Sequence, residues 1–391
     1  MKKIAVICQR YGLEVNGGAE LYARVLAEQL SPYYEVEVLT TCAVDYTTWE
    51  NFYPIGIHDV NGLPIRRFPV DCPRNPERFR EVSEKMFADE RGNREYEELW
   101  IDEQGPYSSE FLRYLSENKD TYDVFLFVTY LYYLTVRGIG LVSDKSILIP
   151  TAHDEPPIYL DVYRDVFTAP RYLVFNTEEE RDFVYGLFRN LQTPGGVFGL
   201  GIETPKGIDP QRFREKFGLS NYVVYVGRID ESKNCKVLFE DFLRYKERNP
   251  SSLKLILMGK AVMEVPKHPD IVPLGFVSDE DKFDGMAGAK LLLLPSAFES
   301  LSLVVLESLA LGVPVIVNGG CTVLKGHCQK SNAGLYYHNF YEFEGGLNYL
   351  FEHLEAYTAL GQNGKQYIAK NYRWEVIIGK FRGMIDTFID G

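Results

Sequence analysis

Strand-like and helix-like segments alternate along most of this 391-residue chain, and this alternation limits the fold more than any other feature. Strands that alternate with helices form parallel sheets, because each return connection crosses a face of the sheet. The apolar runs of the first half that are typical of strands lie at residues 3–8, 34–40, 123–128, 147–150 and 172–175. The first half therefore predicts a doubly wound α/β domain, with charged helices over residues 75–118.

The same pattern starts again after a glycine-rich passage at residues 194–201. The strands predicted in the second half lie at residues 222–226, 253–258, 290–294 and 313–317. The chain is too long for one ordinary core and suits two domains of roughly 150–200 residues. We therefore expect two Rossmann-like doubly wound domains, residues 1–200 and 201–370, that face each other across a deep cleft. The carboxyl ends of both sheets are expected to face that cleft, where a ligand binds.

Composition excludes several classes of protein. The formal net charge of −13 argues against nucleic-acid binding, which needs a basic surface. The six cysteines form no C-x-x-C pair and no dense framework, so we expect reduced thiols; a metal site at Cys321, His327 and Cys328 is the disfavoured alternative. No apolar run approaches the roughly 20 residues of a membrane span, so we expect a cytoplasmic protein. Five arginines within residues 66–80 are typical of a solvated, mixed-charge loop, with a weak contact to the inner face of the membrane as the alternative.

The most specific segment spans residues 295–320 and contains two glutamates, Glu299 and Glu307. Glu299 lies in a loop after a predicted strand, and Ser302 is the expected N-cap of a helix over residues 303–311. Gly312 and Pro314 are suited to end that helix. A helix N-terminus binds a diphosphate through free N–H groups, and neighbouring carboxylates accept hydrogen bonds from sugar hydroxyls.

The segment Val-Gly-Arg at residues 226–228 ends a strand and precedes a helix. Gly227 breaks the strand there, and Arg228 and Lys233 are placed to contact a diphosphate from the end of the sheet. The alternative is two surface cations on a loop. The presence of both glutamates elsewhere in the same domain favours the binding role.

Candidate residues of the first domain follow its strands. Gly17 and Gly18 precede a helix and allow a ligand to approach the backbone closely, although a simple turn is the alternative. His153 and Asp154 follow a predicted strand, where a ligand contact competes with a structural role. Tyr130 and Tyr132 are equally suited to stack on an acceptor sugar and to pack against the protein.

The segment around Glu299 and Glu307 resembles the paired-glutamate motif of the retaining family 4 glycosyltransferases, the group-1 glycosyl transferases of GT-B fold. The resemblance is strong over residues 200–391 and patchy over residues 1–200. It implies that Glu299 contacts the transferred sugar, that Glu307 binds the nucleotide ribose, and that Arg228 and Lys233 neutralise the leaving diphosphate. Residues 371–391 resemble the family's terminal helix, which crosses back to the first domain.

The resemblance implies further contacts. His153 is expected to hydrogen-bond the donor sugar near its reacting carbon, and the backbone at Val277 is expected to read the nucleotide base. The remaining donor contacts are expected at Gly17, Gly18, Gly227, Ser300, Leu301, Ser302 and Leu303. Two departures matter: Leu301 and Ser302 replace the usual Phe-Gly, and Lys325 and His327 lie where many members have a carboxylate.

The expected activity is retaining transfer of a hexose from a nucleotide sugar to a saccharide or lipid-linked saccharide in polysaccharide biosynthesis. UDP-glucose is the first candidate for the donor and GDP-mannose the second. No cofactor or metal is expected, and the acceptor contacts are expected at Tyr130, Tyr132 and Asp154. The alternatives are a catalytically inactive nucleotide-sugar-binding subunit and a nucleotide-sugar epimerase of the same fold.

Overall fold

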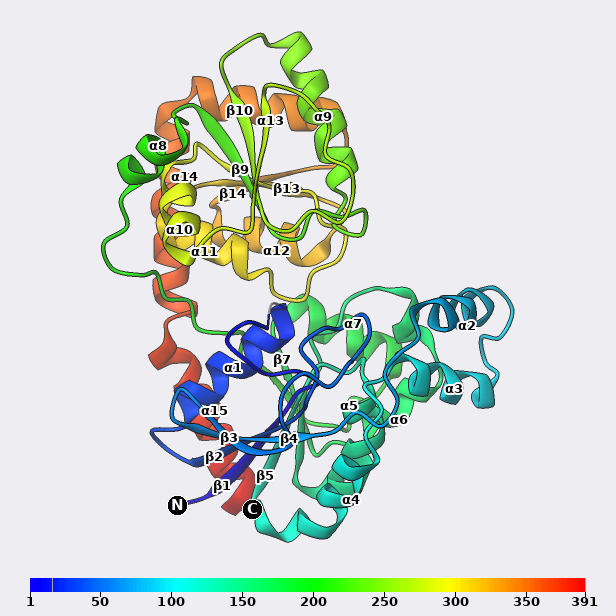
Figure 1. The fold of residues 1–391 in the computed structure, drawn as a ribbon. Helices are drawn as coiled ribbons and strands as arrows, with labels where there is room; N and C mark the ends of the chain where they lie inside the picture. The colour runs from blue at the N-terminus through cyan, green and yellow to red at the C-terminus, as the bar shows by residue number, and fades with distance from the viewer. Residues whose placement is uncertain (16, 391) are drawn as a thin grey trace. The chain divides into compact units, whose positions relative to one another are not determined.

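A computed structural model of the protein describes residues 1–15 and 17–390 (Figure 1). The chain forms two compact units: the first contains Met1–Leu200 and the residues from Ile378 onward, and the second contains Gly201–Ile377. The last helix, α15 (Trp374–Asp390), therefore begins in the second unit and continues in the first. Each unit has its own sheet.

The described residues of the first unit form an eight-stranded sheet in the order β3-β4-β2-β1-β5-β6-β7-β8. Neighbouring strands are parallel, except that β3 and β4 form an antiparallel hairpin at one edge. The strands are β1 (Lys3–Ile7), β2 (Glu35–Thr41), β3 (Gly56–Val60), β4 (Leu63–Phe68), β5 (Val124–Val128), β6 (Ser146–Ile149), β7 (Tyr172–Phe175) and β8 (Gly195–Val197). The α-helices are α1 (Gly18–Leu30), α2 (Pro76–Ala88), α3 (Arg94–Gln104), α4 (Ser109–Asn118), α5 (Tyr133–Gly138), α6 (Val162–Thr168) and α7 (Glu178–Phe188).

The central strands are buried on both faces, so their sequences are continuous apolar runs that can be recognised as strands. The residues of β5 are all buried, as expected for an apolar run covered by helices on both faces of a parallel sheet. The helix α1 places its apolar residues on one side, where Ala23, Leu26 and Leu30 are fully buried. The predicted parallel α/β architecture is confirmed for this unit.

The hairpin β3–β4 was not predicted, although its turn carries a strong sequence signal. Asn61 and Gly62 both have positive φ, 53° and 79°, as the two central residues of a tight hairpin turn require. The interpretation of residues 66–80 as a solvated loop is wrong at its start, because Arg66 and Arg67 lie on β4 and Arg67 is buried. A strand places successive side chains on opposite faces, so one of two adjacent arginines points into the unit.

The described residues of the second unit form a six-stranded parallel sheet in the order β11-β10-β9-β12-β13-β14, with helices on both faces (Figure 1). The strands are β9 (Tyr222–Val226), β10 (Lys254–Met258), β11 (Ile271–Gly275), β12 (Leu292–Leu294), β13 (Val315–Asn318) and β14 (Gly334–Tyr337). The helices are α8 (Pro210–Phe217), α9 (Cys235–Arg248), α10 (Asp279–Gly288), α11 (Leu303–Leu311), α12 (Thr322–Ser331), α13 (Phe340–Glu352) and α14 (Leu354–Asn371). The second predicted α/β unit is confirmed, with β11 and β14 as strands that the sequence patterns had not indicated.

The C-terminal part of α15 packs against the first unit. The hydroxyl of Tyr34 donates to Asp386 at 3.0 Å, and the ring of Phe381 lies edge-on to Phe198 with 5.1 Å between centroids. Lys2 also lies 3.6 Å from Asp386, so the two ends of the chain meet in this unit. Within the described residues, no helix is long and apolar enough to cross a bilayer.

Candidate functional site

The two most specific motifs of the second unit follow neighbouring strands. β9 and β12 are adjacent in the centre of the sheet, with β10 and β11 beyond β9 and with β13 and β14 beyond β12. The order of the strands thus reverses between β9 and β12. In open parallel sheets, ligands bind at the carboxyl ends of the strands where such a reversal occurs.

The loop after β9 holds Arg228 and Lys233 through a buried carboxylate, Asp230. Its Oδ1 accepts from the hydroxyl of Ser232 and from the backbone N–H of Lys233, both at 2.8 Å, and its Oδ2 accepts from the guanidinium of Arg228. Burial opposes ionisation of Asp230, but these hydrogen bonds outweigh it and lower its pKa. Asp230 therefore fixes the positions of both cations, and sequence reasoning had not singled it out.

Two glycines allow the ends of β9 and β10 to approach each other. Gly259 has a φ of 146°, and a Cβ on it would lie 1.9 Å from the carbonyl oxygen of Gly227. Only glycine fits this contact. Gly227 itself has a φ of 145°, a conformation that favours glycine, and its contact with a ligand stays a prediction.

Lys233 and Glu299 join the loops of the two central strands. The Nζ of Lys233 donates to Oε1 of Glu299 at 2.8 Å, and both side chains are mostly buried. The structure thus brings together two residues that the sequence analysis had assigned to one ligand. A cation and a carboxylate at this position suit a ligand with a diphosphate beside a polyhydroxylated group.

Glu307 lies on α11, where it pairs with Lys282 of α10. Nζ of Lys282 is 3.0 Å from Oε1 of Glu307, and the glutamate side chain is only 15% exposed. Burial raises the pKa of Glu307 even though Lys282 favours the charged form. Lys282 is a neighbour that sequence reasoning missed, since nothing in its local pattern marks it.

Ser302 stands at the N-cap position of α11 but does not cap the helix. It adopts a left-handed conformation with φ of 62°, and its buried hydroxyl has no hydrogen-bond partner within the described part of the chain. The prediction of a capping side chain is therefore wrong, because a cap requires an extended backbone at that residue. The left-handed backbone also explains why the family that this motif resembles usually has a glycine at this position. The helix ends as predicted, at a left-handed Gly312.

His327 holds the loop that carries Glu299. It is completely buried, its Nε2 lies 2.7 Å from the carbonyl oxygen of Leu301, and its Nδ1 lies 3.3 Å from the hydroxyl of Tyr367. Burial lowers the pKa of His327 to about 4, against the opposing effect of the Leu301 carbonyl. The ring is thus neutral near pH 7, with the Nε2 proton donated to the carbonyl. His327 supports the loop from behind, and it does not replace a surface carboxylate.

The loop at Gly17 and Gly18 already contains an acidic group. Glu20, in the first turn of α1, is buried and accepts from Nε2 of Gln9 at 2.8 Å and from Nε of Arg10 at 2.9 Å. This carboxylate stabilises the helix N-terminus from within the protein. The ligand contacts expected at Gly17 and Gly18 stay predictions, and Asn16 of the same loop lies outside the described residues.

His153 follows β6 and is partly exposed. Its Nε2 lies 3.3 Å from Glu155, and the buried Glu180 accepts from the N–H of the adjacent Ala152 at 2.5 Å. Asp154 is exposed and accepts from the hydroxyl of Tyr159 at 2.7 Å. The expected roles of His153 and Asp154 stay predictions. Glu180, which holds this loop through the N–H of Ala152, was not among the residues predicted from the sequence.

The two tyrosines after β5 differ. Tyr130 is only 1% exposed, its ring packs on Tyr163 and Phe167, and its hydroxyl donates to Glu155 at 2.8 Å. The prediction that Tyr130 stacks on an acceptor sugar is wrong, because its ring completes the core. Tyr132 is half-buried with its ring edge-on to Trp49, and its acceptor contact stays a prediction.

Phe276 is a candidate that the sequence analysis passed over. It directly follows β11 and is 73% exposed, and its neighbour Val277 is half-buried. An aromatic ring exposed at the carboxyl end of a strand is suited to stack on a planar ring system. The signal was present in the Gly-Phe-Val sequence, where only Val277 was named.

Residues 220–337 match the family model described as glycosyl transferases group 1. An uncharacterized glycosyltransferase, MJ1607, of Methanocaldococcus jannaschii is 23% identical, over 96% of this chain and 95% of its own length. These similarities cover the segment with all four charged residues that the motifs identified, Arg228, Lys233, Glu299 and Glu307.

Two solved structures have the same fold over their whole length. Sucrose-phosphate synthase from Thermosynechococcus elongatus is 16% identical with a TM-score of 0.73, and the match covers 100% of both chains. HepE from Anabaena, in complex with UDP and glucose, is 14% identical with a TM-score of 0.72, over 99% of this chain and 100% of that one. The chain therefore has the GT-B fold, with two Rossmann-like domains, and together with the sequence matches it is a glycosyltransferase.

Proposed function

We propose that this glycosyltransferase binds a nucleotide sugar at the carboxyl ends of β9 and β12 and transfers the hexose with retention of anomeric configuration. The observation that carries the proposal is the ion pair of Lys233 and Glu299, which joins the loops of the two central strands at 2.8 Å. A ligand there meets a cation suited to phosphate and a carboxylate suited to sugar hydroxyls at neighbouring points.

The remaining residues are assigned to the diphosphate, the ribose and the base of the donor. Arg228, held by Asp230, provides a second cation for the diphosphate. Glu307 lies on α11, eight residues after Glu299, and suits the two hydroxyls of the ribose. Phe276 and the backbone at Val277 suit the base, since both directly follow β11. The donor contacts assigned to residues 300–303 fall at the start of α11, where backbone N–H groups lack helical partners.

We infer that the reaction proceeds by attack on the face that the diphosphate leaves. The bond from the anomeric carbon to the diphosphate oxygen breaks while the acceptor oxygen forms its bond on the same face. The acceptor proton passes to the departing phosphate oxygen. Lys233 and Arg228 stabilise the negative charge that develops on that group, which is the main catalytic contribution expected of preorganised donors. Transfer by this route needs no cofactor.

UDP-glucose is our first candidate for the donor and GDP-mannose the second, and HepE, which shares the fold, has been solved with UDP and glucose. We propose a saccharide or lipid-linked saccharide as acceptor, in polysaccharide biosynthesis at the cytoplasmic side of the membrane. His153, Tyr132 and Asp154 of the first unit are the residues we assign to the sugar and the acceptor.

A thermal-shift panel of UDP, GDP, dTDP and ADP tests the proposal. A nucleotide that binds only the folded protein stabilises it by about 2.7 kcal/mol at a concentration of 100 Kd. One of the four should raise the melting temperature, and its sugar conjugate should be turned over with added acceptors. If no nucleotide raises the melting temperature, the proposed site is wrong. Binding without hydrolysis or transfer of any sugar would favour the inactive binding subunit.

A further inference from the structure

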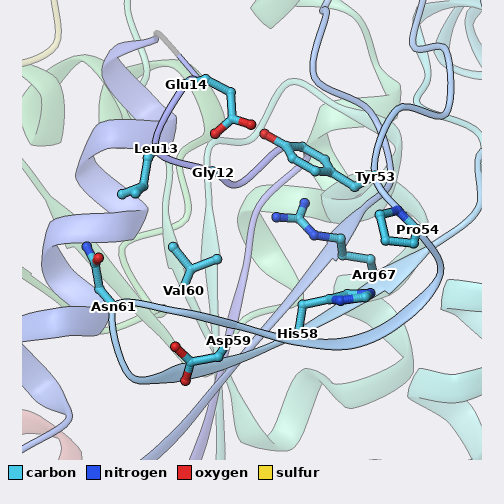
Figure 2. A pocket seen from close by; sticks show the side chains of 10 residues that line it. All are labelled: Gly12, Leu13, Glu14, Tyr53, Pro54, His58, Asp59, Val60, Asn61 and Arg67. Carbon is cyan, nitrogen blue, oxygen red and sulfur yellow. The ribbon is translucent and has the colours of Figure 1, made fainter.

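A pocket of about 350 Å³ in the first unit lies between the loop after β1 and the β3–β4 hairpin (Figure 2). Its wall includes Gly12 and Glu14 of the loop, Tyr53, Asp59 of β3 and Arg67 of β4. None of these residues belongs to the nucleotide-sugar site proposed above. The pocket is of interest because of the state of its one arginine.

Arg67 is a buried cation without a carboxylate partner. It is 3% exposed, and among the described residues its buried Nη1 has no hydrogen-bond partner and no carboxylate oxygen lies within 4 Å of its guanidinium nitrogens. Its guanidinium carbon lies 3.6 Å from the ring centroid of Tyr53. Figure 2 shows the guanidinium in the middle of the pocket, directed towards the Gly12–Glu14 loop.

The neighbouring arginine, Arg66, has the carboxylate partner that Arg67 lacks. Arg66 points to the other face of β4, where its Nε donates to Glu37 at 2.8 Å and its guanidinium lies 4.6 Å from the ring of Tyr114. Arg66 therefore has both a carboxylate and an aromatic ring, whereas Arg67 has only the ring. A buried charge without a counter-ion is strongly destabilising, so its presence calls for a ligand.

The structure assigns this pocket to a single phosphate or carboxylate group, bound by the guanidinium of Arg67. A planar guanidinium binds either group through two parallel hydrogen bonds. The carboxylate of Glu14, which also lines the pocket, disfavours an anion of high charge and is suited to accept from hydroxyls. The occupant that fits both features is a saccharide with one acidic group, such as a sugar phosphate or a uronate. As the acceptor of the reaction, it would rest on the proposed function.

Isothermal titration of the full chain tests the assignment with four probes: inorganic phosphate, glucose 6-phosphate, glucuronate and, as the neutral control, glucose. The titrations use Lys233→Ala, so that the cations of the second unit contribute less to anion binding. We expect the acidic sugars to bind and glucose not to bind. Arg67→Met in the same background should weaken the binding roughly 10- to 100-fold, the range for a charge-assisted hydrogen bond.

The matched control is Arg66→Met, which removes the adjacent arginine from the opposite face of the same strand. It should lower the melting temperature, because the buried Glu37 loses one of its three partners and keeps only Lys3 and Tyr122, yet leave the anion affinity unchanged. Arg67→Met should not lower the melting temperature without ligand, since it removes an unpaired buried charge. Equal anion binding in Arg67→Met and its parent, or no binding of any anion to the parent, would overturn the proposal.

Gly12→Ala keeps the proposal testable if Arg67→Met does not fold. A Cβ on Gly12 would lie 2.3 Å from the hydroxyl of Tyr53, so the ring must shift within the pocket. The variant should bind glucose 6-phosphate at least tenfold more weakly. Unchanged affinity would contradict the assignment.

The same probes distinguish an acidic saccharide from a free small anion as the occupant. Tighter binding of glucose 6-phosphate or glucuronate than of phosphate identifies an acidic saccharide, whereas equal binding of free phosphate identifies a small-anion effector and contradicts the acceptor role. The nucleotide panel fails or succeeds independently, because it reports on the second unit alone.

Discussion

The ammonium of Lys233 lies 2.8 Å from the carboxylate of Glu299, although 66 residues separate them in the chain. Each residue follows one of the two central strands of the second sheet, β9 and β12. The pair compensates two partly buried charges in this structure. A bound diphosphate would share the ammonium, and the sugar next to it would share the carboxylate. The pair therefore links the phosphate and sugar portions of the proposed donor.

Lys233→Ala and Arg228→Ala should each reduce turnover by roughly 10²–10³-fold, because each removes a donor aimed at the developing charge of the diphosphate. Circular dichroism should show an intact fold. Lys236→Ala, which removes an exposed lysine from the same region, is the control and should keep full activity. Near-normal kinetics in both site variants would remove the diphosphate assignment.

Glu307→Gln should weaken binding of the free nucleoside diphosphate roughly 10- to 100-fold, because a charged hydrogen bond contributes about 1.5–3 kcal/mol. Calorimetry with the nucleotide identified in the panel measures this directly. Glu240→Gln, at an exposed position of α9, should bind as the wild type does. An unchanged affinity in Glu307→Gln would mean that Glu307 does not hold the ribose.

Glu299→Gln should keep most of the affinity for the free nucleoside diphosphate and lose most of kcat, since its contact is with the sugar as it approaches the transition state. His153→Ala should behave in the same way if it faces the sugar. Binding and turnover assays on each variant separate the two effects. NMR of the wild-type product gives the anomeric configuration, and an inverted product would refute retention.

Ser302→Gly should leave the free energy of unfolding unchanged or raise it by up to about 1 kcal/mol. The left-handed backbone destabilises a residue that has a side chain by about 1–2 kcal/mol, and glycine removes this strain. Glycine also gives the unfolded chain more conformational freedom, which offsets about 0.4–1 kcal/mol of that stabilisation. Urea unfolding measures the change. Ser308→Gly on the same helix is the contrast: it should destabilise by about 1 kcal/mol or more, because Ser308 is helical and donates to the carbonyl of Val313 at 2.8 Å. A clear loss of stability in Ser302→Gly would contradict this explanation of the backbone.

The buried His327 should make stability depend on pH below neutrality. Its pKa is lowered from 6.5 to about 4 by burial, so the unfolded chain takes up a proton before the folded one does. Stability should therefore fall as pH decreases from about 6.5 to about 4, by roughly 3 kcal/mol from this group. His327→Gln should flatten that fall in urea titrations, whereas His353→Gln, at an exposed histidine, should not. Identical pH profiles for His327→Gln and the wild type would exclude this contribution.

The local patterns of the sequence were sufficient for the fold class and for the charged motifs of the second unit. The apolar run of β5 and the glycine stop after α11 depend on neighbouring residues alone, so they could be predicted from the sequence. The same holds for the order of strand, loop and helix that places Arg228 and Glu299 after strands. The Asn-Gly turn of the β3–β4 hairpin was equally local and was missed because the flanking strand β3 is only partly buried.

Contacts between distant segments were decided by the tertiary structure alone. Lys233 as the partner of Glu299, Lys282 as the partner of Glu307 and His327 behind Leu301 depend on which strands become neighbours. The sequence likewise placed two arginines side by side, and only the pleat of β4 gave Arg66 a carboxylate and left Arg67 buried without one. Periodicity determines which residues form an element, but the pairing of elements determines which charges meet, and no local pattern records that pairing.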